Sequence, residues 1–194
     1  INNNIKINFF FRKDVRYYKR KLKNLKNMIN FYSDPRMSKN VGDWAEILTE
    51  NFFLRQRFEI IEENAKSHDG RVWTKTDHDL DFIIKRNNMC FGIEVKNTLG
   101  YIDRKEWKIK MFEMCEYLNL IPILVARWVP YFYLYDLNNK MNGFTIAFKS
   151  KTFPLGQEEK IREIWKKTML QIRVNRQIFT PKIQKNFENW FNSL

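Results

Sequence analysis

The sequence predicts an α/β fold, in which a mixed β-sheet is flanked by helices and extra helices lie at both ends of the chain. Amphipathic helical segments alternate with short apolar segments, and the segment 121–129 is apolar on both sides, as in a strand of a covered sheet. With 194 residues, of which 44% are hydrophobic, the chain can form one substantial core. We expect a basic helical extension over 1–37, the core over 38–150, and basic helices over 151–194 that pack on the core.

The net charge of +13 is distributed unevenly along the chain. Residues 1–37 contain ten Lys or Arg and two acids, residues 151–194 contain nine and four, and residues 38–150 contain sixteen of each. A basic surplus at the two ends is expected if they bind a polyanion while the neutral centre uses carboxylates for another purpose. Charge alone does not distinguish DNA from RNA or from an acidic membrane.

Two helices are expected in the first quarter of the chain. Apolar residues spaced three and four apart predict a helix over 12–32, and Pro35 breaks this pattern because it disfavours the helical conformation of the residue before it. A second helix is expected to start near Asn40, a good N-cap, and to continue to Leu54.

The next part of the chain is predicted to form strands. Segments 57–64, 72–84 and 89–97 have strand character, and a turn at 68–70 separates the first two. The segment 85–88 is a tight connection, so residues 79–97 are expected to form a hairpin.

The remaining elements follow from periodicity and capping. A helix is expected from Asp103 to Leu118, followed by the apolar strand 121–129. The alternating segments 131–137 and 143–149 predict a further hairpin. An amphipathic helix over 157–170 is expected to pack on the core, and an N-cap with a first-turn proline at 180–181 predicts the last helix.

The segment GIEVKN, residues 92–97, places two charged side chains in a strand that is otherwise apolar. Residues two apart in a strand point to the same face, so Glu94 and Lys96 project together. In the expected hairpin, Asp81 lies on the neighbouring strand close to Glu94. Two such carboxylates repel each other, and Mg²⁺ or Mn²⁺ bound between them removes the repulsion. Lys96 adds a positive charge that can orient a water or stabilise a phosphate, so this set of residues suits phosphodiester hydrolysis.

Asp81, GIEVKN and the upstream segment GDWAE, residues 42–46, together resemble the PD-(D/E)XK nuclease superfamily, which has the restriction-endonuclease-like fold. The resemblance covers about residues 40–127, in the order helix, three strands, helix, strand. The GxxAE pattern is similar to that of archaeal Holliday junction resolvases and their relatives. The chain departs from the family pattern in having no proline before Asp81.

The resemblance implies a role for each matching residue. Asp81 and Glu94 would hold the metal, Lys96 would be the catalytic lysine, and Glu46 would be a further catalytic acid and metal ligand. The acids of the segment DHDLD leave two candidates for the first ligand, Asp79 and Asp81, and we favour Asp81 because the strand continues after it. The alternative interpretations are a structural salt bridge at a sheet edge for the strand residues and an ordinary exposed helix acid for Glu46.

Basic and polar side chains on two segments are expected to contact DNA phosphates. One segment is the first helix and the other follows Lys96, where this superfamily often meets the phosphate backbone. The expected DNA-binding residues are Arg12, Arg16, Lys19, Arg20, Lys23, Asn97, Arg104, Lys105 and Lys108. The aromatic segment 131–135 is compatible with base stacking, although alternating aromatic residues in a strand more often belong to a core.

These observations together predict a Mg²⁺- or Mn²⁺-dependent endonuclease that hydrolyses DNA, and the resemblance to the resolvases implies a homodimer. A Holliday junction or other structure-selective resolvase, a restriction-type sequence-specific enzyme, a non-catalytic DNA-binding module and an RNA-directed nuclease are the alternatives. No small-molecule cofactor and no membrane association are expected. We expect a cytoplasmic location, because the sequence has no apolar run long enough to span a bilayer and its two cysteines are isolated.

Overall fold

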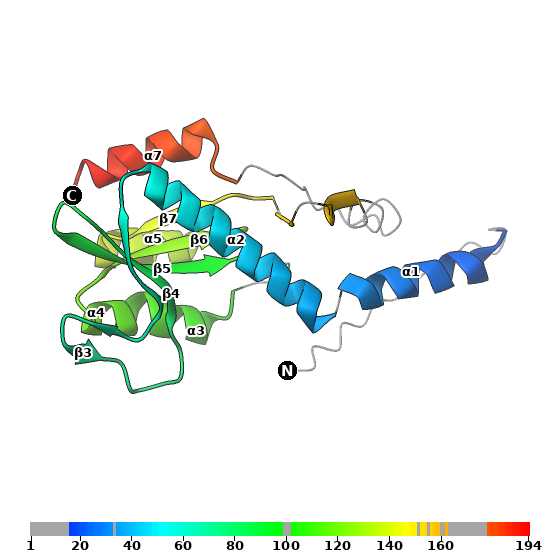
Figure 1. The fold of residues 1–194 in the computed structure, drawn as a ribbon, viewed down its shortest axis with the longest axis horizontal. Helices are drawn as coiled ribbons and strands as arrows, with labels where there is room; N and C mark the ends of the chain where they lie inside the picture. The colour runs from blue at the N-terminus through cyan, green and yellow to red at the C-terminus, as the bar shows by residue number, and fades with distance from the viewer. Residues whose placement is uncertain are drawn as a thin grey trace.

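The computed structural model describes residues 16–32, 34–98, 102–150, 152–154, 156–159, 162 and 178–194. Within these residues the chain forms an α/β structure, with a mixed five-stranded sheet between helices (Figure 1). The prediction of a mixed sheet flanked by helices is therefore confirmed. Among the helices described, none is both long and apolar enough to cross a membrane.

The main sheet has the strand order β1-β4-β5-β6-β7. Its strands are β1 (Glu59–Ala65), β4 (Leu80–Arg86), β5 (Met89–Lys96), β6 (Ile121–Ala126) and β7 (Phe144–Ala147). The first three strands in this order pair antiparallel, and the last three pair parallel. A small separate sheet pairs β2 (Ser67–His68) with β3 (Arg71–Val72) across the predicted turn at 68–70.

The predicted hairpin is formed by β4 and β5. Its first strand begins at Leu80 rather than at residue 72, so it is shorter than expected. Asn87 and Asn88 form the turn with φ angles of 51° and 63°. A two-residue hairpin turn requires such left-handed conformations, and asparagine adopts them more readily than most residues. Phe82 pairs with Ile93, which fixes the register of the two strands.

One face of the sheet is covered by α2 (Pro35–Arg55) and α7 (Pro181–Phe191) (Figure 1). The predicted last helix is thus confirmed. α2 begins five residues before its predicted start, because the side chain of Asp34 accepts a hydrogen bond from the backbone of the first turn. Aromatic rings from the two helices meet over the sheet, with the ring centroids of Phe53 and Phe187 5.6 Å apart.

The other face is covered by the predicted helix 103–118, which is present but not uniformly α-helical. It consists of α3 (Arg104–Lys108), a π-helical segment η1 (Ile109–Met114) and α4 (Cys115–Tyr117). Asp103 caps its first turn, as expected. The π-helical segment was not predicted, and it changes which side chains face the sheet, because each π turn contains more residues than an α turn.

The predicted hairpin over 131–149 is wrong in its first half. Residues 131–141 form the helix α5 (Tyr131–Met141), which ends at Asn142 with a φ angle of 50°. Tyr133 and Leu137, one turn apart, are buried against the face of the sheet that α3 also covers. β7 follows this helix and therefore pairs parallel to β6 instead of forming an antiparallel hairpin.

The predicted first helix corresponds in its described part to α1 (Tyr18–Tyr32). Figure 1 shows α1 extending from the N-terminal end of α2, away from the sheet. The predicted helix over 157–170 falls largely outside the residues that the structure describes.

Candidate active site

Asp81 and Glu94 lie on adjacent strands at the same end of the sheet. The paired residues of β4 and β5 end at Phe82 and Ile93, and Asp81 and Glu94 follow just beyond this last pair. The carboxylate of Asp81 accepts a hydrogen bond from the backbone N–H of Val95, with Oδ2 2.5 Å from the nitrogen. This bond fixes one oxygen of Asp81 beside the strand that carries Glu94.

The surroundings of Asp81 disfavour its negative charge. Burial and the nearby carboxylate of Glu94 raise the pKa of Asp81 to about 8, although the N–H of Val95 and the ammonium of Lys110 act in the opposite direction. Glu46 acts in the same direction as Glu94. Asp81 is therefore a carboxyl group whose ionised form is stabilised by an additional nearby cation.

Glu94 is only 2% exposed, and two lysines approach its carboxylate. The ammonium of Lys110 lies 2.9 Å from each of its oxygens, and that of Lys96 lies 2.6 Å from Oε1. Two ammonium groups therefore meet on one buried carboxylate, and a further carboxylate is needed to balance their charge.

The second carboxylate of the cluster is Glu106 of α3. Its Oε1 lies 2.9 Å from the Lys96 ammonium. Burial lowers the pKa of Lys96, but the carboxylates of Glu94 and Glu106 outweigh burial and raise it overall. Burial likewise raises the pKa of Glu106, and the hydrogen bond and charge of Lys96, with the charge of Lys110, lower it below the ordinary value. Lys96 is therefore a permanent cation held between two carboxylates.

Lys110, like Glu106, is a member of the charged cluster that the sequence interpretation missed. It projects from η1, is 5% exposed, and also lies 3.9 Å from Asp79 and from Glu106. A signal was present, because Lys110 lies between Trp107 and Met111 in the apolar stripe of the predicted helix. A lysine at a core-facing position requires a buried partner, and Glu94 is that partner here.

Glu46 of α2 interacts electrostatically with the same cluster. Burial, followed by the carboxylates of Asp43 and Glu94, raises the pKa of Glu46, and this coupling places its carboxylate in the electrostatic field of the site. α2 is anchored to the end of β5 by Asn97, whose amide donates a hydrogen bond of 3.0 Å to the Val41 carbonyl. The helix therefore positions Glu46 relative to the strand that carries Glu94.

The acidic side chains near Glu94 decide whether the candidate site can bind a divalent cation. Within the described part of the chain, no three His, Cys, Asp or Glu side chains are grouped closely enough to hold one ion. The expected three-carboxylate set of Asp81, Glu94 and Glu46 is therefore not assembled. A pair of carboxylates remains, and Mg²⁺ is commonly bound by one or two carboxylates together with waters and substrate phosphate oxygens. Asp81 and Glu94 are the two carboxylates available for such a pair, and both oxygens of Glu94 already accept hydrogen bonds from Lys110.

The expected DNA-binding residues fall into three groups. Those of α1 and of α3 are exposed, whereas Arg12 lies outside the described residues. Asn97 differs from the expectation, because it is 6% exposed and its amide donates hydrogen bonds to the carbonyls of Val41 and Thr152. Its burial leaves no surface for DNA. The exposed members are Arg16, Lys19, Arg20, Lys23, Arg104, Lys105 and Lys108.

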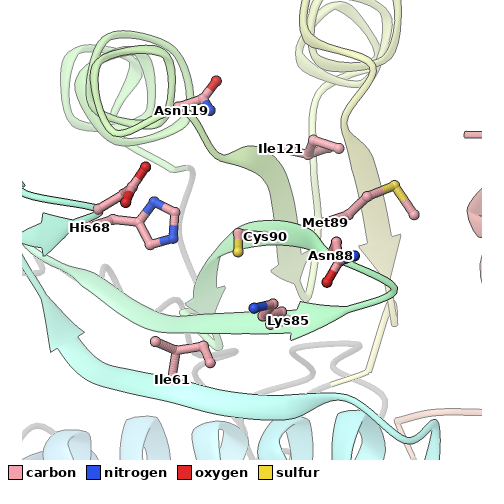
Figure 2. Close-up of a pocket in the computed structure, with 9 residues that line it drawn as sticks. Ile61, His68, Lys85, Asn88, Met89, Cys90, Asn119 and Ile121 are labelled. Atoms are coloured by element: carbon pink, nitrogen blue, oxygen red, sulfur yellow. The ribbon is translucent and has the colours of Figure 1, made fainter.

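A pocket of about 630 Å³ lies at the opposite end of the sheet, near the turn of the β4–β5 hairpin (Figure 2). Cys90, His68 and Lys85 are among its lining residues. Burial raises the pKa of Cys90, which keeps its thiol in the less reactive protonated form at neutral pH. His68 Nδ1 lies 2.9 Å from the Leu118 carbonyl oxygen, so that nitrogen is already occupied. The charged cluster around Glu94 is therefore the better candidate for an active site.

Comparison with known proteins adds no assignment. The cluster contains residues from β4, from β5 and from the helix that follows β5. It lies at one end of the sheet. No protein-family model, curated protein or solved structure matches the chain.

Proposed function

We propose that the protein is a metal-dependent endonuclease that hydrolyses DNA phosphodiester bonds. The observation that carries the proposal is the contact of Asp81 with the backbone of Val95, next to Glu94, with the Lys96 ammonium 2.6 Å from Glu94. The order of helix, strands, helix and strand around these residues supports the resemblance to the PD-(D/E)XK superfamily.

In this proposal the carboxylates of Asp81 and Glu94 hold Mg²⁺ or Mn²⁺. When bound, such an ion polarises the scissile phosphate and acidifies a water molecule. Asp81 loses its proton when the ion binds, because a cation favours the ionised carboxylate. Its Oδ2 is kept in place by the N–H of Val95.

Lys96 positions the nucleophilic water and stabilises negative charge on the phosphate. Its ammonium remains protonated, so it donates hydrogen bonds and does not act as a base. Glu106 holds the Lys96 ammonium together with Glu94. Lys110 neutralises Glu94 in the absence of metal, and its ammonium must withdraw from at least one oxygen when an ion binds.

One observation favours a second candidate, a DNA-binding module without catalytic activity. Both oxygens of Glu94 already accept hydrogen bonds from Lys110, so the buried charges compensate each other without a metal. In this case the cluster stabilises the fold, and the exposed basic residues alone bind DNA.

The two candidates differ in the behaviour of Asp81→Asn. This variant preserves an oxygen that can accept from Val95 and removes the charge that a cation needs. Purified protein is incubated with supercoiled plasmid, linear duplex, single strand and a four-way junction, with Mg²⁺, Mn²⁺ or EDTA. We expect the wild type to cleave with metal and Asp81→Asn to lose cleavage by about two orders of magnitude or more while still binding DNA.

The matched control is Asp136→Asn, which removes an aspartate paired with a lysine on the surface of α5. It should cleave like the wild type. Absence of cleavage by wild-type protein under every metal condition, combined with normal DNA retention, would favour the non-catalytic module. Symmetric nicks at the junction branch would indicate a resolvase, and discrete duplex fragments a restriction-type enzyme.

A further inference from the structure

An exposed aromatic surface lies on the first turns of α5. Tyr131, Phe132 and Tyr135 are 79%, 48% and 57% exposed, whereas Tyr133 and Leu137 on the other side of the helix are buried. Tyr131 and Tyr135 are one helical turn apart and therefore share a face. Three large aromatic side chains gathered on one exposed surface are characteristic of a binding surface rather than of a solvated helix. We call Tyr131, Phe132 and Tyr135 the aromatic face.

The aromatic face is adjacent to the candidate active site. α3 and α5 are in direct contact, because the rings of Trp107 and Tyr133 stack with their centroids 4.0 Å apart. Glu106, which precedes Trp107, reaches the Lys96 ammonium at 2.9 Å. The strand before α5 ends at the same place, since the backbone N–H of Arg127 donates to the carbonyl of Lys96. The first turn of α5 therefore borders the end of the sheet that carries Asp81 and Glu94.

Basic side chains border the aromatic face. The guanidinium of Arg104 lies over the ring of Phe132 at 5.7 Å from its centroid. Lys105 and Lys108 are exposed on the same short helix as Arg104. Asp136, an acid within the same turns of α5, is paired with Lys140 at 2.8 Å. Rings next to cations match the two parts of a nucleotide, because a base stacks on an aromatic ring and its phosphate binds a basic side chain.

The base faces of a duplex are stacked on each other and are not available to a protein ring. We propose that the aromatic face binds unpaired bases of a DNA strand that leads to the active site. This inference rests on the proposed function and specifies its substrate class as DNA with a single-stranded segment, such as a flap, an overhang or a branch. Arg104 and its basic neighbours bind the phosphates of that segment.

The test is DNA binding in EDTA, which separates binding from cleavage. Fluorescence anisotropy is measured with a single strand of about 16 nucleotides and with a blunt duplex of the same sequence. The variants are Tyr131→Ala/Tyr135→Ala and Tyr131→Phe/Tyr135→Phe. Tyr117→Ala is the matched control, because Tyr117 is 43% exposed at the far end of the helix that begins with α3.

We expect the double alanine variant to weaken single-strand binding about tenfold and to leave duplex binding unchanged. The double phenylalanine variant should bind like the wild type, because stacking requires the ring and not the hydroxyl group. Tyr117→Ala should also bind like the wild type. A 2-aminopurine base in the strand should change its fluorescence with wild-type protein and with the phenylalanine variant, and not with the alanine variant.

Equal affinity of the alanine variant and the wild type for single strand would overturn the proposal. The proposal would also be overturned if the wild type were a dimer by sedimentation velocity and the alanine variant a monomer that still binds single strand. That result would assign the aromatic face to self-association. Asp81→Asn keeps the aromatic face intact. A metal-independent binding defect of the alanine variant with no cleavage by the wild type would support the base-binding surface while refuting the nuclease.

Discussion

Glu94 is the residue around which the charges of the site are arranged. It is buried between two lysines, and a third cation would have to share its oxygens with them. Burying charges is costly unless each is paired, so removing one partner is more damaging than removing the whole set. Lys110 therefore stabilises the buried carboxylate of Glu94, and under the proposed function it would compete with the metal ion for that carboxylate.

Replacing Lys110 by Gln should therefore have opposite effects on stability and on metal affinity. The free energy of unfolding in EDTA should fall by about 3 kcal/mol, because Glu94 loses a buried partner. The affinity for Mn²⁺ should rise by about tenfold or more, because a positive charge beside a metal ligand is removed. Urea unfolding and calorimetric titration with Mn²⁺ measure the two quantities.

The control for this pair of measurements is Lys140→Gln, which removes an exposed lysine paired with Asp136. It should change the free energy of unfolding by less than about 0.5 kcal/mol and leave Mn²⁺ affinity unchanged. Unchanged or weaker Mn²⁺ binding by Lys110→Gln would contradict the assignment of Glu94 as a ligand.

Because the pKa of Asp81 is raised, we expect the free energy of unfolding of the metal-free protein to depend on pH. Its folded-state pKa of about 8 lies above the ordinary aspartate value, because of burial and of the charges of Glu94 and Glu46. Between about pH 4 and pH 8 the folded protein therefore keeps a proton that the unfolded chain has lost. The stability from this group is complete below about pH 4 and is lost as the pH rises through about 8.

Wild-type protein in EDTA should consequently lose stability from about pH 5 to pH 8, by up to about 1.4 kcal/mol per pH unit from this group. Asp81→Asn should show a shallower dependence, since it has no titrating carboxyl at this position. The midpoint of urea unfolding at several pH values measures both. Parallel profiles for the two proteins would show that Asp81 is not the group responsible.

The candidate site residues on the strands were predictable, and their helical partners were not. Alternation along β5 and the hairpin register are local properties, and they suffice to bring Asp81 beside Glu94. Lys110 and Glu106 reach Glu94 and Lys96 only through the packing of a helix on the sheet.

At the scale of elements, the helix after β5 must approach the sheet closely to bring Lys110 to Glu94. Gly92 of β5 permits this approach. A Cβ atom added there would lie 2.9 Å from Cys115 Sγ and 2.9 Å from Leu80 Cδ1. The absence of a side chain at Gly92 therefore lets α4 lie close to the sheet. Because α4 continues η1, it also brings η1 close to the sheet.

Gly92→Ala should lower the free energy of unfolding by about 1–3 kcal/mol, because it overpacks this contact. Adding Cys115→Ala should recover part of the loss by removing the sulfur atom that the new methyl group meets. Gly42→Ala is the control, since its Cβ would have only Glu46 Oε1 at 3.9 Å and alanine favours the helix there. Equal stability of Gly92→Ala and the wild type, by urea unfolding, would refute the close approach.

The element that sequence periodicity misassigned is α5. The alternation of aromatic residues over 131–135 indicated a strand, but tertiary packing of Tyr133 and Leu137 overrides it. Two helix signals were present, namely Pro130 just before the first turn and Asn142 at the left-handed C-terminal position. The π-helical segment had no comparable local signal, because it depends on the fit of the helix to the sheet.

At the scale of the whole molecule, the basic helix α1 and the candidate site lie at the same end of the protein. α1 leads into the N-terminal end of α2, and Val41 of that helix contacts Asn97, just beyond β5. Under the proposed function, the exposed lysines and arginines of α1 would bind the same DNA that reaches the candidate site. The described part of the expected basic extension includes α1, on which Lys19, Arg20 and Lys23 are exposed.

Replacing Lys19, Arg20 and Lys23 by Gln should lower the affinity for duplex DNA. It should also make that affinity less dependent on salt concentration. Each lost phosphate contact reduces the slope of log K against log salt concentration by about 0.9, so the triple variant should lower it by about two to three. A triple variant of Arg55, Arg57 and Lys85, near the opposite end of the sheet, should keep the wild-type slope. Identical slopes for both triple variants would exclude α1 from the DNA interface.

The nuclease proposal depends on a divalent ion between Asp81 and Glu94, and anomalous diffraction from crystals soaked in Mn²⁺ tests this most directly. The account predicts a manganese peak bonded to oxygens of both carboxylates, with the Lys110 ammonium displaced from at least one oxygen of Glu94. A map without manganese at this position, in which Lys110 still bonds both Glu94 oxygens, would contradict it.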